Sequence, residues 1–169
     1  MPLIKSSCAS YGLNVILKQS YQPTMQGAET DATLYFFNIG DKILGSPYRA
    51  SVWNTTTLEY EDRDFQRIET TWQLNAHVRQ KPQATTTQPT AKDVINIARM
   101  VMQTREFIET LQSSGLGILR VTDIRNPYFK DDRDQFQASP SFDFTLVHNQ
   151  SMIRQGKTIS SYEYNIKGV

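Results

Sequence analysis

The chain has 169 residues, enough for one domain whose core folds without disulfides or metal ions. Lys and Arg (18) nearly balance Asp and Glu (17), and no basic cluster stands out, which argues against a protein that grips nucleic acid by its phosphates. Its single cysteine, Cys8, excludes an intramolecular disulfide. No apolar run approaches the roughly 20 residues that cross a bilayer, and the N-terminus is too polar for a secretory signal. We therefore expect a protein made in a reducing cytosol.

The first third of the chain predicts short elements followed by a central strand. Residues 3–11 favour a short helix, and residues 13–19 alternate well enough for a strand. The run "TLYFFNI" at 33–39 is apolar on both parities, which is typical of a strand covered on both faces. After it, Gly40, Gly45 and Pro47 predict a break in regular structure.

Residues 57–79 give the clearest periodic signal in the sequence. Ile68, Trp72 and Leu74 share one parity while Glu69 and Gln73 share the other, which indicates a half-buried strand. Such a strand is far longer than the usual 5 or 6 residues. We therefore expect 33–79 to form a long hairpin, with an arm around 40–66 projecting from a single domain 1–169. An ordered loop that folds Trp53 back onto the core stays open as an alternative.

A polar connection at 80–90 leads into the main predicted helix, about 91–114. Thr90 and Asp93 have the spacing of a capping box, and Gly115 is a natural C-terminal stop. Apolar residues recur along one helical face, namely Val94, Ala98, Val101, Ile108 and Leu111, with Ile97, Met102 and Phe107 beside them. The sequence therefore predicts one long helix that covers a sheet.

The last third predicts strands at 117–125, 141–153 and 158–169, with the turn between the last two at 154–157. The predicted class is α+β: a mostly antiparallel sheet with a long hairpin arm, packed by one main helix and a short N-terminal helix.

Catalytic and metal-binding patterns are scarce. The chain has two histidines, of which His77 falls on a polar parity and His148 near a strand end, and Cys8 has no partner at zinc-ligand spacing. No nucleotide-binding or nucleophile-elbow motif is present. We therefore expect no enzyme activity, no cofactor and no metal.

The segment 126–144 combines charge with aromatic groups. Lys130 and Arg133 supply countercharge beside Asp131, Asp132 and Asp134, and the glycine and distal glutamate of a calcium loop are missing. Aromatic anchors beside charges are typical of protein interfaces, which predicts a protein contact; a solvated connection stays open as the alternative. With the exposed apolar part of the hairpin, the predicted interface residues are Tyr48, Arg49, Trp53, Tyr128, Phe129, Asp131, Asp132, Arg133, Asp134 and Phe136.

Several ordered blocks, "YFFNIGDKILGSPYR", "ETTWQLNA" and "GILRVTDIRNPYFKDDRDQFQASPSFDFTLVHNQ", together resemble the neck, tail-terminator or "gateway" proteins of contractile-tailed bacteriophages. The resemblance spans nearly the whole chain. It implies a tail-terminator-like fold and a structural virion protein, made in the host bacterial cytoplasm.

The resemblance also implies partners: copies of the chain in a ring, expected to be a hexamer, tail tube and sheath proteins, and a head-to-tail connector or collar protein. Genomic double-stranded DNA would pass through the lumen without sequence-specific binding. Three alternatives stay open: another tail or connector component such as a stopper or completion protein, a small-ligand-binding module with a pocket lined by Phe36, Trp72 and Phe144, and an enzyme with a metal at the three aspartates.

Overall fold

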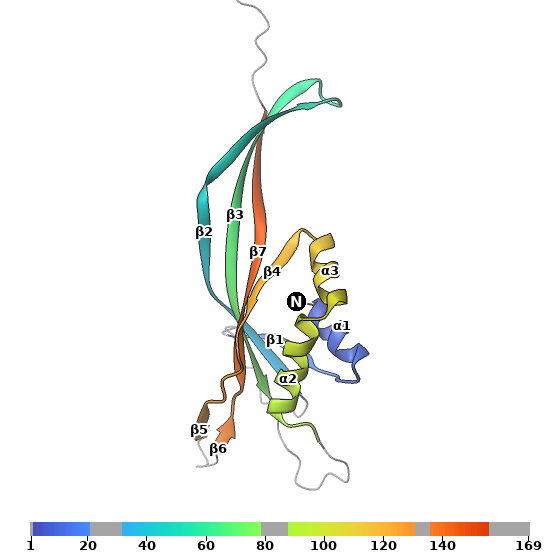
Figure 1. The fold of residues 1–169 in the computed structure, drawn as a ribbon, viewed down its shortest axis with the longest axis vertical. Coiled ribbons are helices and arrows are strands. Elements are labelled where there is room, and N and C mark those ends of the chain that lie inside the picture. Colours follow the sequence, from blue (N-terminus) through green and yellow to red (C-terminus); the bar gives the residue numbers. More distant parts are fainter. Residues whose placement is uncertain (1, 21–31, 79–87, 131–135, 156–169) are drawn as a thin grey trace, which may run out of the picture. The chain divides into compact units, whose positions relative to one another are not determined.

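The computed structural model describes residues 2–20, 32–78, 88–130 and 136–155 (Figure 1). Contacts between residues group the chain into two compact units. Unit 1 comprises Met1–Lys42 and Glu69–His148, and unit 2 comprises Ile43–Ile68 and Asn149–Val169. The single domain with a projecting arm stays a prediction, as do the strand at 158–169 and most of the connection at 80–90, which lie outside the described residues.

The α+β class with a mostly antiparallel sheet is confirmed. Five strands form one sheet in the order β1-β2-β3-β7-β4, with β1 Ile16–Gln19, β2 Thr33–Asn54, β3 Glu59–His77, β4 Leu116–Val121 and β7 Ser141–Gln155. Within it, β1 runs parallel to β2, and β4 runs antiparallel to β7. A second, two-stranded sheet pairs β5 Tyr128–Lys130 with β6 Phe136–Ala138, where the sequence predicted only a loop.

The predicted break after residue 39 is wrong, because β2 continues to Asn54. Gly45 has φ +66°, a conformation that glycine adopts at no steric cost, so the irregularity stays inside the strand. Pro47 is tolerated because β1 pairs with β2 only at Thr33–Phe36 in the described chain. The second half of β2 therefore lies at an edge of the described sheet, where a missing N–H removes no ladder bond. The alternative of an ordered loop that folds Trp53 back onto the core is also wrong, because Trp53 lies in β2 and is 43% exposed.

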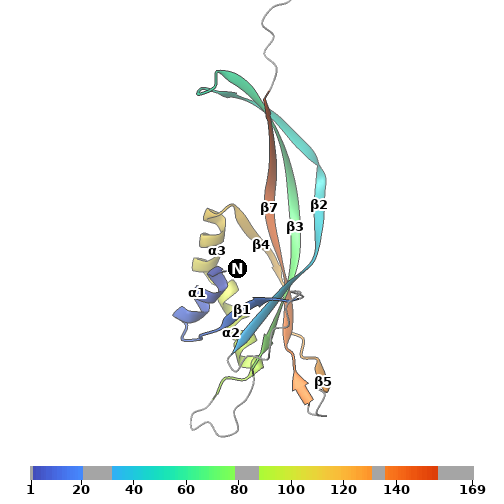
Figure 2. The same ribbon diagram turned by 180° about the vertical axis from the view of Figure 1, so that it is seen from behind.

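Three helices lie on the same side of the strands of unit 1 (Figures 1 and 2): α1 Pro2–Ser10, α2 Ala91–Met102 and α3 Arg105–Ser113. The predicted capping box is confirmed, since Thr90 accepts from the backbone of Asp93 and the Asp93 carboxylate accepts from Thr90 N–H at 2.9 Å. The single helix at 91–114 is wrong. Thr104 adopts an extended backbone (φ −69°, ψ 147°) and caps a new helix, because its hydroxyl accepts from Phe107 N–H.

This break changes which residues face the core. In α2 the buried side chains include Val94, Ala98 and Val101, as the periodicity predicts. In α3 they are Phe107 and Leu111, and Ile108 is only half-buried. Because a new helix begins at the Thr104 cap, the 3.6-residue repeat of α2 does not continue into α3. Extending that repeat across residue 104 therefore predicts the wrong burial for Ile108.

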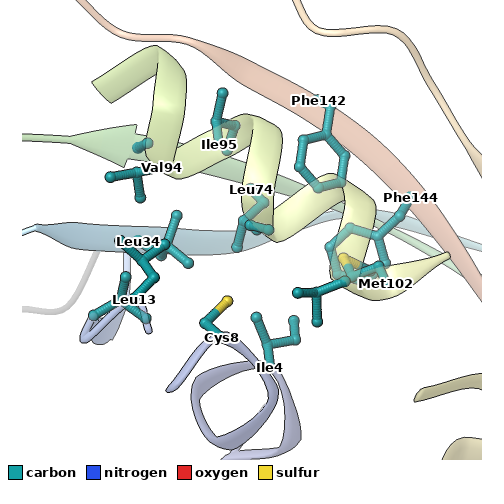
Figure 3. Close-up of a cluster of buried hydrophobic side chains, with 14 of the residues drawn as sticks. Ile4, Cys8, Leu13, Leu34, Leu74, Val94, Ile95, Met102, Phe142 and Phe144 are labelled. Atoms are coloured by element: carbon teal, nitrogen blue, oxygen red, sulfur yellow. The ribbon is translucent and has the colours of Figure 1, made fainter. Parts of the chain in front are cut away.

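The core of unit 1 lies between the three helices and the sheet. In Figure 3, Ile4 and Cys8 of α1 approach Leu34, Leu74 and Phe144 from the strands, and α2 contributes Val94, Ile95 and Met102. Phe142 and Phe144, with ring centroids 6.3 Å apart, are the largest fully buried side chains. Burying each such ring contributes roughly 1.5–3 kcal/mol, so this layer fixes the sheet against the helices.

On the other face of the sheet in unit 1, β3 and β7 carry polar side-chain pairs. Asp143 accepts hydrogen bonds from Gln73 at 3.0 Å and from Arg125 at 2.6 Å, and the hydroxyls of Thr71 and Thr145 lie 3.3 Å apart. These pairs set β3 antiparallel to β7, in register with the bond from Ala76 N–H to the Pro140 carbonyl. The alternation predicted for residues 68–78 therefore separates the core face of β3 from this polar face.

Candidate interaction surface

The described part of unit 2 consists of three strand segments: the second half of β2, the first half of β3 and the end of β7. Three side-chain pairs fix the register of β2 against β3: Arg49 with Asp64, Ser51 with Asp62, and Trp53 with Tyr60. Residue numbers rise in one member as they fall in the other, as in an antiparallel hairpin. Because directly opposite residues share a face, these six side chains lie on one face of unit 2, here called the paired face.

The turn of this hairpin carries backbone strain. Asn54 accepts from the N–H groups of Thr56 and Thr57 through its side chain, and its carbonyl accepts from Leu58 N–H at 2.9 Å. Leu58 closes the turn at φ +55°, the described chain's one positive φ outside glycine. A leucine in this left-handed region costs roughly 1–2 kcal/mol relative to its usual backbone, and its side chain is 67% exposed.

A row of charges crosses the three strands on the paired face. Asp64 of β3 accepts from Arg49 of β2 at 2.9 Å and from Arg154 of β7 at 2.5 Å. The Asp64 side chain is only 18% exposed, so the two guanidinium groups largely cover it. The hydrogen bond from Arg154 and then that from Arg49 lower the pKa of Asp64 below its ordinary value of 3.8.

The opposite face, here called the apolar face, holds residues of the other parity. Tyr48, Val52 and Ile153 project there and are 70%, 43% and 56% exposed, and Phe65 is half-buried. On the same face, Glu61 accepts hydrogen bonds from Asn54 and from Arg63, which in that order lower the pKa of Glu61 below 4.5. No helix of the described chain belongs to unit 2.

Cys8 is buried in α1, and this burial raises the pKa of its thiol to about 11, which keeps it protonated and unreactive. Among residues 2–20, 32–78, 88–130 and 136–155, no three His, Cys, Asp or Glu side chains are grouped to hold a metal ion. Within those same ranges no helix is long and apolar enough to span a membrane.

Comparison with known protein families gives one decisive match. The family model described as "E217 gateway protein gp29" matches residues 1–157. The chain belongs to this bacteriophage gateway family. The resemblance drawn from the sequence blocks is thereby confirmed. A search of curated proteins finds no significant match.

The predicted interface residues of this gateway chain fall in both units. Tyr48, Arg49 and Trp53 belong to unit 2, with Arg49 and Trp53 on the paired face and Tyr48 on the apolar face. Tyr128 and Phe129 lie in β5 and Phe136 in β6, where Tyr128 pairs with Ala138 and Lys130 with Phe136. Asp131, Asp132, Arg133 and Asp134 lie outside the described residues. The contact role of all ten residues stays a prediction.

Sequence reasoning missed the acidic partners in β3 and the basic one in β7. In the sequence, Asp62 and Asp64 lie in the charged run "EDRDFQR" at 61–67, and the predicted turn at 154–157 includes Arg154, whereas the structure places all three in strands. Residue parity in the predicted strand is the signal that could have found them. Asp62 and Asp64 are both even-numbered and therefore lie on one face of the strand, whereas Glu61 and Arg63 lie on the other face.

The ligand-binding alternative required an apolar pocket between three aromatic side chains. Phe36 and Trp72 instead pack on each other with ring centroids 5.9 Å apart, and both pack against the core. Phe144 is 1% exposed inside that core. These rings therefore contribute to packing, and no specific observation favours a ligand there.

Proposed function

We propose that this gateway protein is a structural component of the phage neck that forms a closed ring of about six copies. The ring caps the tail tube, joins it to the head-to-tail connector and leaves a lumen for DNA. The match of residues 1–157 to the gateway family carries this proposal. The proposed site of action is the virion, after synthesis in the bacterial cytoplasm.

The surface of unit 2 supports a role in assembly. Tyr48, Val52 and Ile153 expose apolar area on one face of a short sheet, which is unfavourable in water unless another protein covers it. A ring subunit needs two different surfaces that complement each other, because only heterologous contacts generate a closed ring of more than two copies. The chain's near-zero net charge, +1, suits a conduit along which DNA slides, since a strongly cationic wall would hold phosphates.

The segment 128–136 is the proposed contact with a second neck or tail protein. Its aspartates would accept charge-assisted hydrogen bonds and its aromatic residues would anchor the contact. Changing Asp131 and Asp132 together to Asn should leave the thermal midpoint nearly unchanged while leaving tails unattached to heads. A matched control changes Asp123, an exposed aspartate outside this segment, to Asn, and normal particles are expected.

Electron microscopy of assembled particles, with native mass spectrometry of the extracted neck, tests the ring. We expect density for about six copies at the junction of tail and head. A ring of clearly different order, or no ring at the neck, contradicts the proposal. If a divalent cation raises the thermal midpoint of the wild type but not that of the Asp131/Asp132 variant, the segment is a metal site and the proposed contact role is wrong.

A further inference from the structure

Within the described residues, unit 2 has two strand edges that lack a strand neighbour. On one side, β1 pairs with β2 only at Thr33–Phe36, so the part of β2 in unit 2 has β3 alone as a strand neighbour within the described chain. On the other side, β4 pairs with β7 only as far as His148. In the described chain, the segments Arg49–Trp53 and Asn149–Ile153 are therefore the two edges of the three-stranded part of the sheet in unit 2.

The direction of the backbone groups along the β2 edge follows from the turn. The Asn54 carbonyl points into the hairpin, since it accepts from Leu58 N–H. Backbone groups alternate in direction along a strand, so Arg49, Ser51 and Trp53 direct their N–H and C=O groups away from β3. Pro47 has the same parity, which explains why the missing N–H is tolerated.

The same reasoning applies to β7. The Pro140 carbonyl accepts from Ala76 of β3, whereas Ser141 and Asp143 bond to the chain on the other side, at Arg125 and Thr122. Odd-numbered residues of β7 thus point away from β3. Beyond the end of β4, the ones that do so are Asn149, Ser151 and Ile153.

We propose that the β7 edge of unit 2, residues 149–153, pairs with the β2 edge, residues 49–53, of the next copy in the ring. This inference rests on the proposed ring function and names the contact that closes it. In one copy, β2 and β7 both run antiparallel to β3 and therefore point in the same direction. If the axis of the ring runs along the strands, β7 of one copy and β2 of the next also point in the same direction, so they would pair in parallel. Six copies would contribute eighteen strands, and barrels of about that size leave an aqueous channel.

A second copy fits these edges better than an unrelated partner. The two edges belong to one sheet but to different strands, β2 and β7, and each directs the backbone groups of three alternating residues outward. A repeating head-to-tail contact requires two such different, complementary surfaces on every copy. Natural edges that stay solvated usually carry several charges. On these two segments the charge is limited to Arg49, which Asp64 already neutralises, and Val52 and Ile153 are exposed beside it.

Engineered cysteines test the pairing in assembled particles. Ser51 and Arg154 lie on the paired face, so even-numbered residues of β7 share the face of Ser51. Pro47→Cys or Ser51→Cys combined with Gln150→Cys or Met152→Cys places both thiols on that face, at a strand spacing that suits a disulfide. Oxidation should then give a ladder of covalent multimers up to the ring size. Native Cys8 is buried and adds little background.

The matched control combines Ser51→Cys with Ser151→Cys or Ile153→Cys, whose side chains project on the opposite face, and it should give no ladder. A ring without a ladder from any same-face pair would overturn the edge pairing but leave the proposed function standing. Equal ladders from both classes would also overturn it, because they would show unspecific collisions. Particles that lack a ring would overturn the proposed function and this inference together.

Discussion

Arg154 of β7 donates a hydrogen bond of 2.5 Å to Asp64 of β3, joining residues that are 90 positions apart in the chain. The bond lies beyond His148, where β4 no longer pairs with β7. It therefore holds the end of β7 on β3 at a point where no other strand of the described chain supports it.

Replacing Asp64 by Asn should loosen this end of unit 2, because the amide keeps the shape but loses the charge that both Arg49 and Arg154 contact. Hydrogen exchange should accelerate at residues 149–155, with little change at 141–147. Asp62→Asn is the control, since Asp62 accepts only from the Ser51 hydroxyl among the described groups. If both variants exchange at the same rate in β7, the Arg154 contact does not stabilise the strand.

Unit 2 should lose stability in acid. The pKa values of Asp64 and Glu61 lie below their ordinary values of 3.8 and 4.5, so both carboxylates bind protons less readily in the folded state. Their contribution is complete above about pH 4.5 and disappears as the pH falls through the lowered pKa values. Hydrogen exchange of unit 2 between pH 7 and pH 3, corrected for intrinsic rates, should show this loss, and Asp64→Asn should reduce it.

Phe144→Ala should lower the free energy of unfolding by about 3–5 kcal/mol, because it leaves a cavity in the core of unit 1. The control is Leu119→Ala, a 53% exposed side chain on β4, for which we expect a change within about 0.5 kcal/mol. Urea denaturation measures both. Equal losses would show that Leu119 is covered in solution.

Leu58→Asn should raise the free energy of unfolding by up to about 1 kcal/mol, since asparagine tolerates the left-handed conformation better than leucine. Leu58→Val should have the opposite effect, because a β-branched side chain suits positive φ least. Thermal unfolding of unassembled chains compares the three. A neutral result for both variants would mean that the turn relaxes without cost.

Segment Ser46–Thr57 should exchange its amide hydrogens faster than Ile68–Val78 in the isolated chain. The former includes the exposed Tyr48 and the part of β2 whose one strand neighbour in the described chain is β3, whereas the latter lies between β2 and β7 and includes the buried Leu74. Assembly into particles should slow exchange in the first segment. Equal protection in the isolated chain would show that Trp53 needs no partner to be ordered.

The sequence by itself determined the features that depend on interactions between residues close together in the chain. The alternation in 68–78 sets the two faces of β3, and the Thr90–Asp93 spacing starts α2, because side-chain parity and a cap depend on neighbours a few residues away. The blocks of residues also sufficed to indicate the gateway family.

Only the tertiary structure decided the rest. Pro47 is predicted as a break, yet it continues a strand because that part of β2 lies at an edge of the described sheet. Thr104 falls inside the single predicted helix, yet it caps a second helix. Arg154 is predicted in a turn, yet it contacts Asp64. Strand register, and not distance along the sequence, decides which charged side chains become neighbours. The strand edges of unit 2 in the described chain likewise depend on where β1 and β4 stop pairing, a property of the whole sheet that no local pattern encodes.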